Sequence, residues 1–221
     1  MYAQNSTLLI RHAQASFGAS NYDQLSELGV KQAQLLGLHL KRQRCHFEAI
    51  YLGELKRHHQ TLNHILGSGL DAPAPLVSPA LNEYDSDALL SAYQAASHSR
   101  DTELQHFKAL RRALRLWMTG EIAPVGMPSY SDFKRNLLNF LGHIRAQHAG
   151  PVMVISSGGP ISTMVGSLFE ANVDATISLN YRLRNASITE LAHDSKRHQL
   201  VGLNHIEHLA DPEQPSRITY I

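Results

Sequence analysis

The stretch "PVMVISSGGPISTMVGSLF", Pro151 to Phe169, decides the fold class. It begins with the apolar run Pro151 to Ser156, which has the length and composition of a fully buried strand. Two glycines, Gly158 and Gly159, follow at once, and such a pair after a strand is typical of a tight turn. The residues after the turn continue as a helix. A buried strand that passes directly into a helix predicts an α/β protein.

The same alternation of strand and helix continues on both sides of this stretch. Apolar runs predict strands at 7–10 and 49–52, a short strand within 74–85, and two closing strands within 185–191 and 199–204. Helices are predicted at 54–65 and at 26–42, where Ser26 is the expected N-cap. Strands that alternate with helices are typical of a mostly parallel sheet with both faces covered. We therefore expect a three-layer α/β/α sandwich.

The alternation breaks between about residues 87 and 126, and we expect a helical insertion here, over the edge of the sheet where ligands bind. Four apolar residues follow helical spacing and predict one buried face, namely Phe107, Leu110, Leu114 and Trp117. Four basic residues lie on the other faces of that helix, namely Lys108, Arg111, Arg112 and Arg115. The basic face is either solvated or lies over a pocket, where it would attract an anionic substrate.

The composition argues against several classes of protein. The 221 residues include 20 Lys and Arg and 19 Asp and Glu, so the chain lacks the basic excess of a dedicated nucleic-acid binder. The single cysteine, Cys45, excludes an internal disulfide framework and is typical of a reducing compartment. The first residues do not resemble a secretory signal, and no apolar run reaches the ~18 residues of a membrane helix. We expect a cytoplasmic protein with no nucleic-acid or membrane partner.

Polar residues that suit an anion site follow the predicted strands. They are Arg11 and His12 after the first strand, Arg57 early in the second helix, Glu83 after the third strand, and Ser157 with Gly158 in the opening stretch. In an open parallel sheet, the carboxyl ends of the strands meet where ligands bind. Arginine forks match phosphate oxygens, and the amides at a helix N-terminus favour anions. These residue types predict a phosphate site. The 14 histidines are scattered without metal-ligand spacing, so we expect no metal.

Four motifs follow one another along the chain: "LLIRHAQAS…LSELGVKQAQLLG", "YLGELKRHHQT", "LNEYD" and "VISSGGPIS". Together they resemble the histidine phosphatase superfamily, in its phosphoglycerate mutase-like branch. The resemblance covers nearly the whole chain, and the helical insertion and the tail match least. It implies one phosphoglycerate mutase-like domain over residues 1–221, with the insertion at about 87–126.

The resemblance also implies roles for individual residues. His12 falls on the histidine that takes the phosphoryl group, and it must be unprotonated to act as a nucleophile. Arg11 and Arg57 would depress the pKa of that histidine and bind the phosphoryl oxygens. Glu83 falls on the acid that protonates the leaving oxygen, for which its pKa should be raised by partial burial. Without the other motifs, Glu83 reads equally well as a loop carboxylate paired with an arginine.

The chain departs from the family pattern in the first motif. Ala13 stands where glycine is usual, which is a mild change if its φ is negative. Gln14 replaces a common glutamate, and Ala15 replaces a hydroxyl residue. Gln14 and Ser16 are therefore accessory candidates, Ser16 as a substitute for the lost hydroxyl.

A further departure concerns the charge of the site. Ser157 stands where the family pattern predicts a second histidine that donates a hydrogen bond to the phosphoryl group. A serine donates without the positive charge, and losing one preorganised donor costs ~10²–10³ in kcat. We therefore expect weak activity, with Ser157→His raising it if the chemistry is otherwise intact. His58, beside Arg57, is an accessory candidate for the vacated space.

Three functions stay open at this point. The preferred one is hydrolysis of phosphomonoesters through a phosphohistidine at His12, without a metal or an organic cofactor, on a small phosphorylated substrate. A phospho-ligand binding protein on a degenerate, non-catalytic scaffold is the alternative, favoured by Ser157, Ala13 and Ala15. A phosphoglycerate-type mutase is less favoured, because the missing second histidine would slow transfer in both directions. Inorganic phosphate is an expected ligand in each case, and the oligomeric state stays open.

Overall fold

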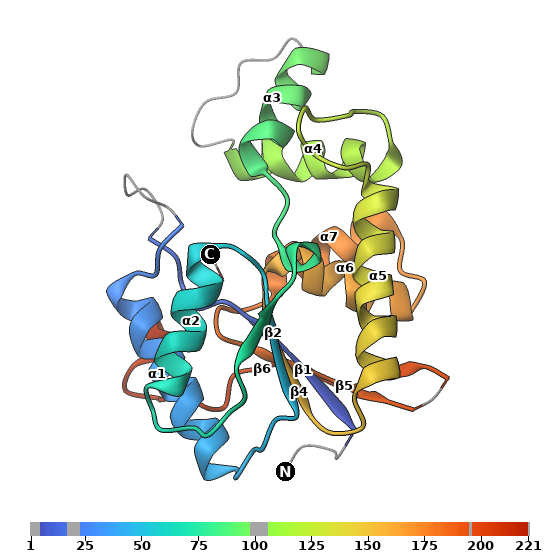
Figure 1. The fold of residues 1–221 in the computed structure, drawn as a ribbon. Helices are drawn as coiled ribbons and strands as arrows, with labels where there is room; N and C mark the ends of the chain where they lie inside the picture. The colour runs from blue at the N-terminus through green and yellow to red at the C-terminus, as the bar shows by residue number, and fades with distance from the viewer. Residues whose placement is uncertain (1–4, 17–22, 98–105, 195, 221) are drawn as a thin grey trace.

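The computed structural model describes residues 5–16, 23–97, 106–194 and 196–220, which build a six-stranded sheet (Figure 1). The strands are β1 (Ser6–Arg11), β2 (Ala49–Leu52), β3 (Pro75–Val77), β4 (Val152–Ser156), β5 (Ile188–His193) and β6 (His198–His205). Their spatial order is β3-β2-β4-β1-β5-β6. The first four in that order run parallel, and β5 is antiparallel to both β1 and β6. The sheet is therefore mostly parallel, as predicted, with an antiparallel edge.

Helices cover both faces of the sheet (Figure 1). They are α1 (Glu27–Arg42), α2 (Lys56–Leu66), α3 (Ser86–Ser97), α4 (His106–Thr119), α5 (Tyr130–Gln147), α6 (Gly158–Leu168) and α7 (Val173–Arg182). Successive side chains of a strand point to opposite faces. Leu8 and Ile10 accordingly pack in one core with residues of α1 and α2, and Leu9 packs in a second core with residues of α5 and α6. The predicted α/β/α layering is confirmed.

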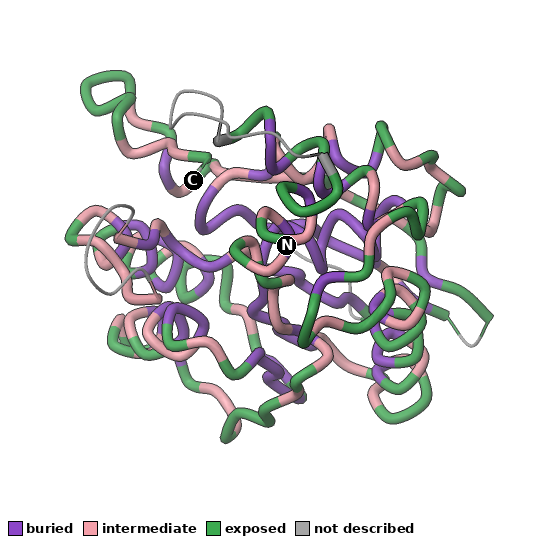
Figure 2. The backbone as a smooth tube through the Cα atoms, turned by 90° about the horizontal axis from the view of Figure 1, so that it is seen from above, coloured by how far each residue is buried: buried purple, intermediate pink, exposed green. Residues whose placement is uncertain are grey.

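Burial follows from this layering. Figure 2 shows the buried segments gathered in the middle of the molecule and the exposed ones around its margin. Every residue of β2 and β4 is buried, which explains why these strands are continuous apolar runs rather than alternating ones. Within the described ranges, no helix combines the length and the apolarity that crossing a bilayer requires.

The sequence correctly predicted where the helix that follows β1 begins. The hydroxyl of Ser26 accepts a hydrogen bond from the amide of Gly29 at 3.0 Å, as an N-cap does. The apolar face of α1 then packs toward the sheet through Ala33, Leu36 and Leu40. The helix at 173–182, α7, was not among the predicted elements.

The helical insertion holds two helices, α3 and α4, which lie above the carboxyl ends of the parallel strands (Figure 1). Leu110, Leu114 and Trp117 are buried, as their spacing predicts. Phe107 is 42% exposed, so the prediction was wrong for this residue, and the buried face begins one turn later. On the basic side, Arg115 pairs with Asp174 of α7 at 2.8 Å, which ties the two helices together.

Candidate active site

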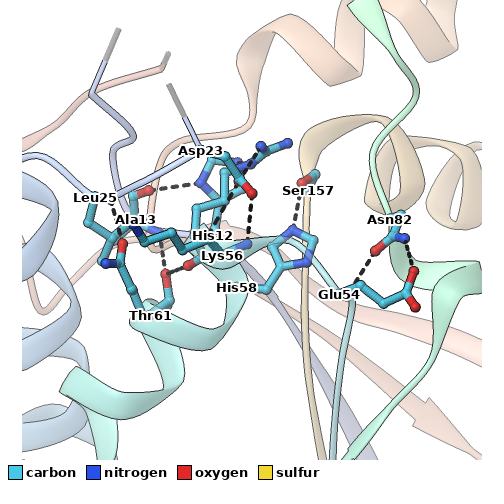
Figure 3. Close-up of polar contacts among 12 residues, drawn as sticks. His12, Ala13, Asp23, Leu25, Glu54, Lys56, His58, Thr61, Asn82 and Ser157 are labelled. Atoms are coloured by element: carbon cyan, nitrogen blue, oxygen red, sulfur yellow. Dashed lines mark hydrogen bonds and ion pairs between the residues drawn. The ribbon is translucent and has the colours of Figure 1, made fainter. Parts of the chain in front are cut away.

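The predicted polar residues meet at the carboxyl ends of β1, β2 and β4. The register aligns Arg11 at the end of β1 with Ser156 at the end of β4, and the amide of His12 donates to the carbonyl of Ser156 at 2.9 Å. Ser157 therefore follows β4 directly beside His12, although 145 residues separate them in the sequence (157 minus 12). The helix after β2, α2, brings Arg57 and His58 to the same place, and Figure 3 shows His58 beside Ser157.

Hydrogen bonds define the tautomer of His12, which is 4% exposed. Its Nδ1 lies 2.8 Å from the carbonyl oxygen of Ala13, and because that oxygen only accepts, Nδ1 carries the proton. Its Nε2 accepts a hydrogen bond from Nε of Arg57 at 3.2 Å. Nε2 therefore presents an unshared electron pair to the site.

The electrostatics keep this ring neutral. Burial lowers the pKa of His12 well below its usual value, and the charges of Arg57 and Arg11 lower it further. A proton on Nε2 would place a positive charge in a buried ring next to two guanidinium groups. His12 is therefore neutral at neutral pH, as a nucleophilic histidine must be.

A carboxylate that the sequence did not single out holds Arg57. Asp23 accepts from NH1 of Arg57 at 2.8 Å and also accepts from the backbone amide of Lys56 at 2.8 Å. The residue at the N-cap position of α2, Leu55, has no side chain able to accept these bonds. Asp23 therefore caps α2 from a distant loop and orients the arginine at the same time. The sequence signal for such a distant cap was the absence of a capping side chain in "GELKR", where α2 begins.

Arg11 contacts the carboxy-terminal part of the chain. Its NH1 donates to the carbonyl oxygens of Leu183 and Tyr220. The same guanidinium lies close enough to His12 and Glu83 to lower both pKa values. Its role in phosphate binding stays a prediction, and the structure adds that Arg11 anchors the tail beside the site.

Glu83 approaches the site from the segment after the short 3-10 helix at 79–81. One carboxylate oxygen accepts from the amide of Gly159 at 3.1 Å, and the other accepts from the amide of Tyr84 at 3.2 Å. Burial raises the pKa of Glu83, and these amides and the charges of Arg57 and Arg11 oppose the rise only in part. A half-buried carboxyl with a raised pKa is suited to donate a proton.

Gly158 and Gly159 open α6, as predicted, and both positions are too crowded for a side chain. A Cβ on Gly158 would collide with Oδ1 of Asn180, and a Cβ on Gly159 would collide with the carboxylate of Glu83. The second glycine therefore lets Glu83 approach the helix N-terminus.

The second imidazole of the site belongs to His58. This residue is fully buried, and its Nε2 lies 2.8 Å from Oγ of Ser157 (Figure 3). Its ring centroid is 5.7 Å from that of His12. The accessory candidate His58 is therefore placed in contact with Ser157, whereas the adjacent His59 is half-buried on α2.

Gln14 and Thr61 form hydrogen bonds that fix the conformation of the first motif. The side-chain oxygen of Gln14 accepts from the hydroxyl of Ser26 at 2.7 Å, so Gln14 fastens this loop to the start of α1. Thr61 accepts from the amide of Ala13 at 3.1 Å and donates to the carbonyl of Arg57 at 2.7 Å, which links the two motifs. Ala13 has no positive φ, so alanine is unstrained there. The amide of Ser16 donates to a carbonyl oxygen at 2.8 Å, and its proposed hydroxyl role stays a prediction.

Arg135 forms an ion pair with Asp132, one turn earlier on α5. Among the residues that the structure describes, no group of three or more His, Cys, Asp or Glu side chains is arranged to hold a metal ion. Asn21 and Tyr22, which follow the first motif in the sequence and are plausible substrate-facing residues, lie outside the described residues.

Comparison with known proteins identifies a family that the chain matches. Residues 7–206 match the histidine phosphatase superfamily (branch 1). A protein of Hydrogenobacter thermophilus named "Putative phosphoserine phosphatase 2" is 24% identical over 214 residues, which cover 90% of this chain and 95% of the relative.

Two solved structures share the fold. The phosphoserine phosphatase of Entamoeba histolytica, in complex with 3-phosphoglyceric acid, has a TM-score of 0.66 and 21% identity and covers 93% of this chain and 99% of its own. A mycobacterial glucosyl-3-phosphoglycerate phosphatase has a TM-score of 0.62 and 22% identity and covers 91% of this chain and 99% of its own.

Proposed function

Because this chain belongs to the histidine phosphatase superfamily (branch 1) over residues 7–206, we propose that it hydrolyses phosphomonoesters through a phosphohistidine at His12. The observation that carries the proposal is the state of His12. Its Nδ1–H is bound to the carbonyl of Ala13, which leaves Nε2 unprotonated and next to Arg57. A neutral, oriented imidazole beside a guanidinium is what attack on a phosphoryl group requires.

The first step transfers the phosphoryl group to His12. Nε2 forms a bond to phosphorus while the bond from phosphorus to the leaving oxygen breaks. Arg57 releases Nε2 and, with Arg11, binds the phosphoryl oxygens and offsets their charge. Glu83 enters this step protonated and donates its proton to the leaving oxygen, which departs as an alcohol.

The second step returns the enzyme to its starting state. Glu83, now a carboxylate, takes a proton from a water molecule whose oxygen attacks phosphorus. The bond between phosphorus and Nε2 of His12 breaks, and inorganic phosphate leaves. In this scheme, side chains supply every proton and every positive charge, so it uses no metal ion and no organic cofactor.

A pocket of about 280 Å³ adjoins Glu83, and none of His12, Arg11, Arg57 and Ser157 lines it. Its other lining residues include polar and apolar side chains, among them Asn82, Asp85, Met127, Phe133 and Asn136. The names of the relatives point to phosphoserine and to phosphorylated glyceric acids. We propose small phosphorylated metabolites as the substrates.

The test is hydrolysis of p-nitrophenyl phosphate and phosphoserine without added metal, with the wild type beside His12→Ala. We expect turnover in the wild type, none in His12→Ala, and an acid-labile phosphoryl label in the wild type alone during turnover. Equal turnover in both proteins would refute the role of His12.

A non-catalytic, phospho-ligand binding role is the second candidate. It is favoured by Ser157, whose hydroxyl brings no positive charge to the place where the family pattern has a histidine. Calorimetric titration with inorganic phosphate separates the two: binding without turnover of any ester in a panel of phosphomonoesters supports the second candidate. Neither binding nor turnover would refute both.

A further inference from the structure

One buried imidazole has no part in the chemistry proposed above. His58 has no exposed surface, and its Nε2 lies 2.8 Å from Oγ of Ser157, which is also fully buried. Figure 3 shows the ring of His58 directed from α2 toward Ser157, across the end of the sheet. Burying a polar imidazole costs free energy of desolvation unless a hydrogen bond offsets it. The contact with Ser157 supplies that hydrogen bond, and its role in the site is the question.

The surrounding backbone makes room for this ring. A Cβ on Gly53, at the end of β2, would lie 2.5 Å from Nδ1 of His58 and 2.8 Å from Oδ1 of Asn82. Asn82 in turn accepts from the amide of Glu54 at 2.7 Å and donates to its carboxylate at 2.7 Å (Figure 3). Gly53 therefore leaves the space that Nδ1 of His58 occupies, and β2 and α2 together set the position of the ring.

The side chain of Ser157 does not cap the helix that it precedes. It occupies the N-cap position of α6, where a serine side chain usually accepts a hydrogen bond from the first turn. Its side chain makes no such bond and contacts His58 instead. The hydroxyl therefore stays at the end of β4, whose last residue accepts from the amide of His12 at 2.9 Å.

We infer that His58 is a positioning residue that aims the hydroxyl of Ser157 at the phosphoryl group carried by His12. Nε2–H of His58 donates to Oγ of Ser157, and Oγ–H donates to a phosphoryl oxygen. Nδ1 of His58 faces the backbone of Gly53 without a hydrogen bond of good geometry, and the tautomer with the ring proton on Nε2 is part of this inference. The inference rests on the proposed function and adds to it a neutral donor made of two residues.

The ring is held neutral by its surroundings. Burial, and next the charge of Arg57, lower the pKa of His58 to about 3. The titratable groups that face it are Arg57, His12 and His59, and none of them brings a negative charge. The pair therefore donates a hydrogen bond without adding a positive charge, across the whole neutral pH range.

The same geometry changes the expectation for Ser157→His. That substitution was expected to raise activity by restoring a missing donor. The space in front of residue 157 is filled by His58, so a second imidazole would displace it, and we now expect Ser157→His alone to give no gain.

The test compares kcat and KM for a set of substitutions at the two positions. His58→Leu removes the donor at similar volume, His58→Gln keeps an N–H group near the place of Nε2, and Ser157→Ala removes the hydroxyl. We expect His58→Leu and Ser157→Ala each to lower kcat by ~10², the typical cost of one preorganised donor, with KM changed less than about threefold. His58→Gln should recover at least tenfold over His58→Leu. The double variant His58→Leu with Ser157→Ala should be no slower than either single variant, because the two residues act as a unit.

His59→Leu is the matched control, since it changes the adjacent histidine of the same helix, and it should keep kcat within about twofold. Circular dichroism and thermal melts establish that each variant is folded. Equal activity of the Gln and Leu variants, or additive losses in the double variant, would refute the pairing. Wild-type turnover that depends on His12 but not on Ser157 or His58 would overturn this inference alone, whereas turnover independent of His12 would overturn the proposed function.

Discussion

The contact between Gly159 and Glu83 offers a sharp perturbation of the proposed acid. In Gly159→Ala, the new methyl group would lie 2.5 Å from Cε1 of Tyr84 and would collide with the carboxylate of Glu83. Comfortable contacts between heavy atoms begin at about 3.5 Å. The carboxylate and the tyrosine ring must therefore retreat by roughly 1 Å, and the 3.1 Å bond from the amide of Gly159 is lost.

A displacement of this size in a catalytic group costs about 10² in rate. We expect Gly159→Ala to lower kcat by about that factor on an alkyl phosphate that the wild type hydrolyses. The loss should be smaller, about tenfold or less, on p-nitrophenyl phosphate, because its leaving group needs little help from an acid. Steady-state kinetics on both esters, beside Glu83→Gln, measure the difference.

Gly142→Ala is the matched control. This glycine lies in α5, and a Cβ there would have no neighbour within 4 Å. Since alanine favours a helix over glycine by ~0.5–1 kcal/mol, Gly142→Ala should be slightly stabilised and fully active. A folded Gly159→Ala that keeps kcat within threefold on the alkyl ester would refute the role given to Glu83.

Three further predictions concern the support of the site. Asp23→Ala should cost about 1 kcal/mol of stability, as loss of a helix cap does. It should also lower kcat/KM about tenfold, because Arg57 loses its 2.8 Å partner. Chemical denaturation and steady-state kinetics measure the two effects, and an unchanged kcat/KM would contradict the role of Asp23 in orienting Arg57. His58 has a pKa of about 3 in the fold against 6.5 when unfolded, so its contribution to stability is complete above pH 6.5 and is lost as the pH falls toward 3. Between about pH 7.5 and about pH 5.5 the wild type should lose ~1.4 kcal/mol more than His58→Gln, and equal losses in urea unfolding would contradict this. Gln32→Ala should cost ~1–3 kcal/mol, because buried Gln32 accepts from the amide of Gln14 at 2.9 Å and donates to the tail at 2.8 Å; a loss below about 0.5 kcal/mol would show that water replaces these bonds.

The sequence by itself determined the architecture and predicted which residues would lie together at the candidate site. Strands such as 152–156 are apolar on both faces because helices cover both sides, so composition alone identified them as buried. Parallel strands end at one edge, so Arg11, Arg57 and Glu83 were correctly expected to meet near His12. The helix 173–182 was missed because it follows α6 after only a short connection and its buried residues, Thr176 and Ile177, give little periodic signal.

What the tertiary structure decided are the contacts between segments that lie far apart in the sequence. Asp23 caps α2 across 33 residues, and His58 reaches Ser157 across 99. No local pattern encodes either pair, because hydrophobic periodicity reports which face of an element is buried and not which side chain it meets there. Ser157, where the resemblance to the family predicts a histidine, therefore read as a loss in the sequence. In the fold, a buried imidazole from another helix lies against that serine, because Gly53 leaves the space for it.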